Sequence, residues 1–298
     1  MDLDKLNKDF SLPGNLEFSD IKEGFTIASI KNGFSEATIA LQGAQILTFR
    51  PNGQKPVIWL SGDARYVSGK SARGGVPVCW PWFGPHPVES DFPAHGPART
   101  INWQVTKTGK LEDGSVFISL LLPEHDAVKK VWPFPAKLEL HVTVGASIKI
   151  ELVTSNTGKD SFVISEALHT YFHISDIDKV KINGLDNTEY VDKVGTVSRK
   201  KQQGAVTIQS EVDRVYLNTT TDCSIEDMGW NRKIIIKKSG SHSTVVWNPW
   251  IEKAEKMGDL GTEGYRQMLC VESGNALENS VEVKDKHILS VEYSVETI

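Results

Sequence analysis

Cysteine is scarce in this chain. Only three of its 298 residues are cysteines, Cys79, Cys223 and Cys270, and no two of them form a CxxC pair. This spacing argues against a structural zinc or redox motif. Cys79 and Cys270 lie in apolar runs, where a free thiol usually behaves as a small core residue. A chain of this length can bury a core large enough to fold without disulfides or metal.

Long apolar runs and basic runs are missing too. No window approaches 18 apolar residues, and Met1–Phe10 alternates in charge without the apolar stretch of a signal peptide. The net charge of −5 argues against nucleic acid or an anionic membrane as the main partner. We expect a cytoplasmic protein, a monomer or weak dimer, with no nucleic-acid or membrane partner.

The common catalytic and ligand-binding motifs are also absent. The sequence has no GxSxG elbow, no HExxH, no GxGxxG and no P-loop, which argues against the usual hydrolase, zinc, dinucleotide and nucleotide sites. His86 and His95 have no HxH or CxxC nearby, so no cluster of His, Cys and carboxylate stands at metal-ligand spacing. We therefore predict no metal and no cofactor.

What the sequence has in abundance is strand periodicity. Alternate residues from Leu138 to Val144 are apolar, and Ile148–Leu152 returns with the same period after a turn. Similar runs occur at 25–30, 38–49, 57–60, 116–122, 233–236, 244–247 and 289–295. Helical periodicity is confined to 5–10 and 250–260. With no repeat and no break in composition, the pattern predicts an all-β protein, one large antiparallel β-sandwich domain over residues 1–298.

Two ionisable residues lie in segments that otherwise have the pattern of buried strands. His169 is in Ser165–Phe172, and Glu272 is in Met268–Ser273. An imidazole in an apolar run either makes a core hydrogen bond or transfers protons. A carboxylate in such a strand tends to have a raised pKa, which suits a general base. A buried acid and a buried base favour an active site over unrelated accidents.

The segment from Gly69 to Arg99 resists regular structure, because it holds six prolines. Long ordered loops of this kind are more often functional than linkers. Arg73 stands directly before two glycines, which let a backbone pass close to a ligand, and arginine offers a planar fork of donors. Arg73 and Arg99 therefore suggest a site for phosphate or carboxylate. The alternative is surface pairing with a carboxylate such as Glu89 or Asp91.

Residue type leaves two further questions open. Trp80, Trp82 and Trp247 are either platforms for the apolar face of a sugar or parts of the core. Asp213 either accepts hydrogen bonds from ligand hydroxyls or caps a turn.

Five segments occur in an order that resembles a known family: Arg73–Gly84, Pro93–Arg99, Ala167–Phe172, Asp213–Tyr216 and Cys270–Glu272. The resemblance is to the bacterial glucose-6-phosphate 1-epimerases, or D-hexose-6-phosphate mutarotases, of the aldose 1-epimerase superfamily. It covers the chain from about Ala37 to Tyr293. One such motif is a weak signal, whereas five in order are specific.

The resemblance implies a galactose-mutarotase-like sandwich and an isomerase that interconverts the α and β anomers of hexose 6-phosphates, glucose 6-phosphate above all. It also implies roles for six residues: His169 as general acid, Glu272 as general base, Arg73 and Arg99 as phosphate ligands, His95 as a pocket residue and Asp213 as a partner of a sugar hydroxyl. One residue departs from the family pattern, because Pro97 stands where phenylalanine is usual. Proline fixes φ and removes a backbone donor, which bears on the placement of Arg99.

Two other functions stay open. One is mutarotation of neutral aldoses such as galactose, which is disfavoured if Arg73 and Arg99 both point into the pocket. The other is non-catalytic binding of a carbohydrate or sugar phosphate, which needs rings and hydrogen bonders but no facing acid and base. It is disfavoured if His169 and Glu272 lie on opposite sides of one pocket.

Overall fold

Strands are the dominant regular structure of this chain, and several of them alternate between buried and less buried side chains, as a period of two predicts. The computed structural model describes residues 2–298. In β8 (Ala136–Val144), every second side chain from Leu138 to Val144 is buried. The predicted runs at 25–30, 116–122, 233–236 and 244–247 are strands, and the all-β prediction is confirmed.

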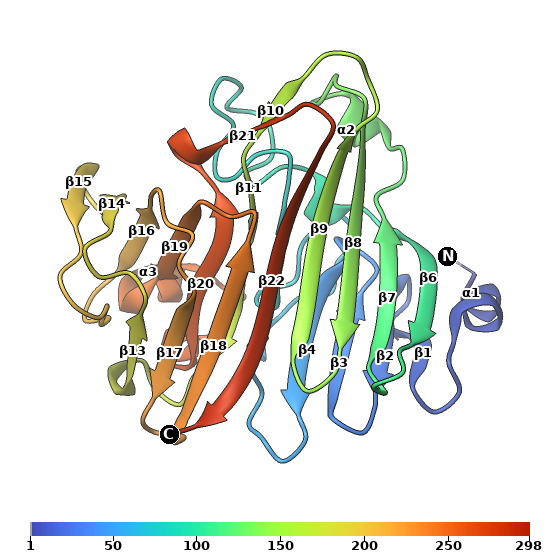
Figure 1. Ribbon diagram of the computed structural model, residues 1–298, viewed down its shortest axis with the longest axis horizontal. Coiled ribbons are helices and arrows are strands. Elements are labelled where there is room, and N and C mark those ends of the chain that lie inside the picture. The colour runs from blue at the N-terminus through green and yellow to red at the C-terminus, as the bar shows by residue number, and fades with distance from the viewer. Residues whose placement is uncertain (1) are drawn as a thin grey trace.

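One eight-stranded sheet forms the layer nearest the viewer in Figure 1. In spatial order it consists of β13 (Val180–Asn183), β17 (Cys223–Asp227), β18 (Arg232–Ser239), β22 (Lys286–Thr297), β9 (Ile148–Asn156), β8, β7 (Val116–Leu121) and β6 (Gln104–Lys110). Neighbouring strands in it run antiparallel.

Two further sheets lie behind this layer (Figure 1). The first has β1 (Leu16–Lys22), β2 (Phe25–Lys31), β3 (Ser35–Ala40) and β4 (Gln45–Pro51). The second, which carries the site described below, has the order β15 (Ser198–Lys201), β14 (Glu189–Asp192), β16 (Val212–Tyr216), β19 (Ser243–Asn248), β20 (Met268–Asn275), β11 (Glu166–Leu168) and β5 (Val78–Cys79), with β12 (Tyr171–His173) also paired to β20. Side chains from all three sheets, among them Phe49, Leu140 and Val271, meet in one core cluster. A small sheet of β10 (Phe162–Ile164) and β21 (Val281–Val283) lies apart from these three.

Helices are few and short. They are α1 (Leu3–Phe10), α2 (Asp126–Lys129), α3 (Trp250–Lys256) and α4 (Gly264–Gln267), with 3₁₀ turns η1 (Ala98–Thr100), η2 (Ile177–Lys179) and η3 (Leu277–Asn279). The Asp2 side chain caps α1 by accepting from the Lys5 backbone N–H at 3.0 Å. Within residues 2–298, no helix is both long enough and apolar enough to cross a membrane.

Three local predictions were wrong. The apolar run 38–49 is two strands, because the chain reverses at Gly43 and Ala44, both with positive φ. Residues 57–60 form only isolated bridges, Ile58 to Phe172 and Leu60 to Gly74. The helix predicted over 250–260 ends at Lys256, and a loop leads on to α4.

Candidate active site

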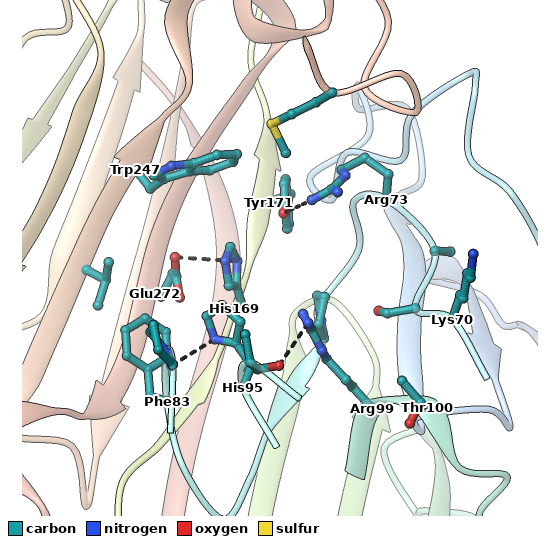
Figure 2. A pocket seen from close by; sticks show the side chains of 18 of the residues that line it. Lys70, Arg73, Phe83, His95, Arg99, Thr100, His169, Tyr171, Trp247 and Glu272 are labelled. Carbon is teal, nitrogen blue, oxygen red and sulfur yellow. Dashed lines mark hydrogen bonds and ion pairs between the residues drawn. The ribbon is translucent and has the colours of Figure 1, made fainter. Parts of the chain in front are cut away.

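A cavity of about 540 Å³ lies between the sheet that contains β20 and loops from the first hundred residues. All six residues singled out in the sequence line it: Arg73, His95, Arg99, His169, Asp213 and Glu272. Figure 2 shows Glu272 on one side, Lys70, Arg73 and Arg99 on the other, and His169 between them. The five sequence motifs therefore meet in one place.

Glu272 is held on β20, a strand whose eight residues are all buried. Successive side chains of a strand point to opposite faces, so Val271 enters the core while Glu272 faces the pocket. The Glu272 side chain is 1 % exposed, and its Oε2 atom has no hydrogen-bond partner among residues 2–298. Burial, with a smaller contribution from nearby Asp213, raises the pKa of Glu272 well above 4.5.

His169 lies at a break between β11 and β12, where its N–H donates to the carbonyl of Pro77 at 3.0 Å. This break turns the imidazole into the cavity, stacked on the Tyr171 ring at 4.9 Å between centroids. Burial, with the neighbouring His95 and Arg99, lowers the pKa of His169 well below 6.5.

His169 and Glu272 do not lie on opposite sides of the pocket, which is the arrangement that the sequence analysis expected of a catalytic acid and base. His169 Nδ1 lies 3.4 Å from Glu272 Oε1, so the two share one wall (Figure 2). Burial opposes a charge on either group, which favours a proton on Glu272 and a neutral imidazole. The pair can therefore donate one proton and accept another at two neighbouring oxygen atoms of a ligand in the cavity.

His95 has a fixed orientation. Its backbone φ is 67°, its N–H donates to the carbonyl of Gly84 at 2.7 Å, and its ring Nδ1 accepts from the Gly84 N–H at 3.2 Å. Burial, reinforced by Arg99, Lys193 and Arg73, lowers the pKa of His95 to about 3. Because Nδ1 accepts, the neutral ring carries its proton on Nε2 and is a donor.

Arg73 contacts a carboxylate, but neither of the two considered from sequence. Its Nε donates to Asp259 Oδ1 at 3.0 Å, and Nη1 donates to the Tyr171 hydroxyl at 3.3 Å. Arg99 lies in η1 and donates from Nη2 to the carbonyl of Ala94 at 3.0 Å. Pro97 precedes this turn with φ −83°, near the range to which the proline ring restricts φ, so proline is compatible with the turn that holds Arg99.

Glycine is required at the two positions after Arg73 for a different reason from the one that the sequence suggested. A Cβ on Gly74 would lie 2.6 Å from the carbonyl oxygen of Trp59, and one on Gly75 would lie 2.3 Å from that of Ile46. Their φ angles are 108° and 70°. Glycine is needed here because the loop packs against protein backbone, not because a ligand approaches it.

The structure narrows the open alternatives for Asp213 and the tryptophans. Asp213 lies within β16, paired with Trp247 on β19, so it does not cap a turn. Trp247 lines the cavity, whereas Trp80 and Trp82 are almost fully buried. Burial raises the pKa of Asp213.

Sequence reasoning missed three residues of the pocket, Lys70, Tyr171 and Lys193. Lys193 follows β14; its N–H donates to the carbonyl of Asp213 at 2.8 Å, and its Nζ lies 5.5 Å from the centroid of the Phe83 ring. A single lysine among 33 basic residues is not part of a sequence pattern that would identify it as a pocket residue. Tyr171 was inside a recognised motif and could have been chosen.

The prediction that no His, Cys and carboxylate cluster exists was also wrong. Ligand atoms of His169, Cys270 and Glu272 all lie within 4.8 Å of one another. The cluster could not be predicted from spacing, because His169 is about a hundred residues away from Cys270 and Glu272 in the sequence. Only the spacing of Cys270 and Glu272, which places both on one face of β20, was visible.

The antiparallel sandwich thus places a buried carboxyl group and an imidazole beside cationic side chains in one pocket. A family model described as Aldose 1-epimerase matches residues 26–296. The chain is 38% identical over 253 residues to a protein of Escherichia coli (strain K12) named "Putative glucose-6-phosphate 1-epimerase", covering 84% of this chain and 83% of that protein. The chain belongs to the aldose 1-epimerase family and is an isomerase.

Solved structures agree with this fold. A crystal structure of a "putative mutarotase" from Salmonella typhimurium superposes with a TM-score of 0.90 at 30% identity, covering 97% of this chain and 96% of that one. A galactose mutarotase-like protein from Clostridium acetobutylicum has a TM-score of 0.73 at 14% identity, covering 95% and 98%. The predicted galactose-mutarotase-like sandwich is confirmed.

Proposed function

We propose that the protein interconverts the α and β anomers of hexose 6-phosphates, with glucose 6-phosphate as the preferred substrate. The observation that carries the proposal is the His169–Glu272 pair in a pocket whose other side presents Lys70, Arg73 and Arg99. Curated relatives named as glucose-6-phosphate 1-epimerases support the same substrate class.

In the proposed reaction, the proton that the resting pair holds on Glu272 first moves to His169 across their 3.4 Å contact. Glu272 then accepts the proton of the anomeric hydroxyl while His169 donates a proton to the ring oxygen. The bond between C1 and the ring oxygen breaks, its electron pair goes to that oxygen, and C1 becomes an aldehyde. Rotation about the bond from C1 to C2 presents the other face of the aldehyde. The ring then closes as His169 takes its proton back and Glu272 returns the other.

The 3.4 Å separation of the two groups suits this chemistry, because the anomeric and ring oxygens are bonded to one carbon. Nη atoms of Arg73 and Arg99, with Lys70, are the donors proposed for the phosphate, since guanidinium groups form charge-assisted, bidentate contacts with it. Asp213 and the Nε2 of His95 are proposed to hydrogen-bond sugar oxygens.

NMR exchange spectroscopy tests the proposal. Cross peaks between α- and β-glucose 6-phosphate should grow at mixing times too short for the spontaneous reaction when the protein is added. Free glucose, measured beside it, should exchange much more slowly. Faster exchange of free glucose would favour neutral aldoses as substrates, and no acceleration of either sugar would favour a non-catalytic binding protein.

A further inference from the structure

The cluster of His169, Cys270 and Glu272 presents nitrogen, sulfur and oxygen to a single point. His169 Nδ1 lies 3.4 Å from Glu272 Oε1 and 3.8 Å from Cys270 Sγ. With zinc bonds of about 2.0 Å to nitrogen and oxygen and 2.3 Å to sulfur, ligand atoms of a tetrahedral site are about 3.3–3.6 Å apart. The two separations from His169 Nδ1 are close to this geometry, and because the ligand atoms of all three residues lie within 4.8 Å of one another, the set has to contract around the ion to complete it.

One oxygen of the cluster also lacks a partner in the protein. Glu272 is 1 % exposed, yet its Oε2 has no hydrogen-bond partner among residues 2–298. An unpartnered buried carboxylate oxygen is costly and is available to a cation. Because His169 and Glu272 line the cavity, an ion between them leaves a coordination position open toward it.

We propose that these three residues bind Zn²⁺ when the pocket holds no sugar, and that the bound ion inhibits the enzyme. Zinc would take the lone pairs of His169 Nδ1 and the Glu272 carboxylate, together with the Cys270 thiolate. Binding displaces the protons of the acidic ligands, as metal binding to thiols does. Two anionic ligands then neutralise the charge of the ion.

Inhibition is expected because the zinc ion and the proposed reaction use the same atoms of His169 and Glu272. The proposed proton transfers need free lone pairs on His169 and Glu272, which the ion occupies, so zinc and hexose phosphate compete. Zinc binding itself does not depend on the sugar chemistry, whereas the inhibitory consequence rests on the proposed function. The two can therefore be tested apart.

Binding is tested with Co²⁺, which substitutes for zinc and reports its ligands by colour. Titration of the full-length protein should produce a thiolate-to-metal charge-transfer band that saturates at one ion per chain and disappears on adding Zn²⁺. Cys270→Ala should abolish the band. Cys223→Ala, which removes a buried cysteine outside the cluster, is the matched control and should retain it.

Inhibition is tested by anomer exchange, with each variant compared with its own rate in EDTA. Zinc should inhibit the wild type reversibly, and Cys270→Ala should raise the inhibitory zinc concentration at least about tenfold, as even loss of an outer-shell partner typically does. If Cys270→Ala does not fold, Cys270→Ser serves the same purpose, because a serine hydroxyl is not among the usual zinc ligands. Absence of the thiolate band in the wild type, or its persistence in the Cys270 variant, would overturn the site.

Discussion

The Glu272 carboxyl group lies on a strand in which every residue is buried, and the His169 imidazole lies next to this carboxyl group. Burial of this kind is tolerated where the group has a task that a neutral residue cannot perform. We expect Glu272→Gln and His169→Asn each to slow anomer exchange at least about a hundredfold, because each removes one proton-transfer partner. NMR exchange rates give the loss, and circular dichroism checks the fold.

A second buried Glu–His pair provides the control for this experiment. Glu166 Oε1 lies 2.8 Å from His287 Nε2, and neither residue lines the cavity. Glu166→Gln should keep the exchange rate near that of the wild type. A folded Glu272→Gln protein with a near-normal rate would remove Glu272 from the mechanism.

Arg73 is the residue whose effect should depend on the substrate's charge. A charge-assisted hydrogen bond contributes roughly 1.5–3 kcal/mol, so Arg73→Ala should lower kcat/KM for glucose 6-phosphate by about 10- to 100-fold. Any activity on free glucose should change much less. Arg50→Ala, which breaks the surface ion pair with Glu36, is the matched control. Equal losses on both sugars would mean that Arg73 shapes the pocket and does not contact phosphate.

The sequence singled out six residues that the structure brings together in one cavity, because their motifs combine restricted residue types in a fixed order. The same reasoning cannot find Lys193 or Asp259, since each is a single common residue brought in by a separate loop. The side-by-side arrangement of His169 and Glu272 was also out of reach. It depends on how β12 and β11 pair with β20, and register between distant strands is not encoded locally.

At the scale of elements, strands with a clean period of two were predictable, and segments stabilised by tertiary contacts were not. The loop between α3 and α4 is an example, because the pattern there predicted a helix to Leu260. The loop instead presents Asp259 to Arg73 and offers the Gly258 carbonyl to Arg65 Nη2 at 3.1 Å. It therefore connects the C-terminal part of the chain to the side of the pocket that carries Arg73.

This loop should position Arg73 for the substrate. Fixing a long side chain in advance is worth about 0.5–1.5 kcal/mol, so Asp259→Ala should raise KM for glucose 6-phosphate about two- to tenfold with little change in kcat. Asp259→Asn keeps an acceptor oxygen and should stay near the wild type. Steady-state kinetics decide the matter. A lower KM in both variants would show that Asp259 competes with the phosphate instead of holding its ligand.

For the whole molecule, Glu272 makes stability depend on pH. Its pKa in the folded protein is raised above 4.5, so the folded state holds the proton more tightly than the unfolded chain. Its contribution to stability is present below pH 4.5 and is lost as the pH rises through the folded pKa. A glutamine at position 272 does not ionise, so it does not cause this loss of stability at high pH.

Thermal unfolding of Glu272→Gln should therefore resemble that of the wild type near pH 5 and occur at least about 2 °C higher near pH 9, about the shift that 1 kcal/mol produces in a large domain. Glu36→Gln, at an exposed surface position, should show no such pH-dependent gain. A difference in Tm that is constant or shrinks with rising pH would contradict the assigned direction of the pKa.

The residues proposed for proton transfer and those proposed for the phosphate come from different parts of the fold. Glu272 lies within β20 and His169 lies between two short strands that both pair with β20, whereas Lys70, Arg73 and Arg99 are carried by the chain between β4 and β6. Point changes at these three positions can alter the charge that the pocket accepts while the strands stay in register. The sugars that such an enzyme accepts can therefore change, in evolution or by protein engineering, while the residues proposed for proton transfer at the anomeric carbon stay the same.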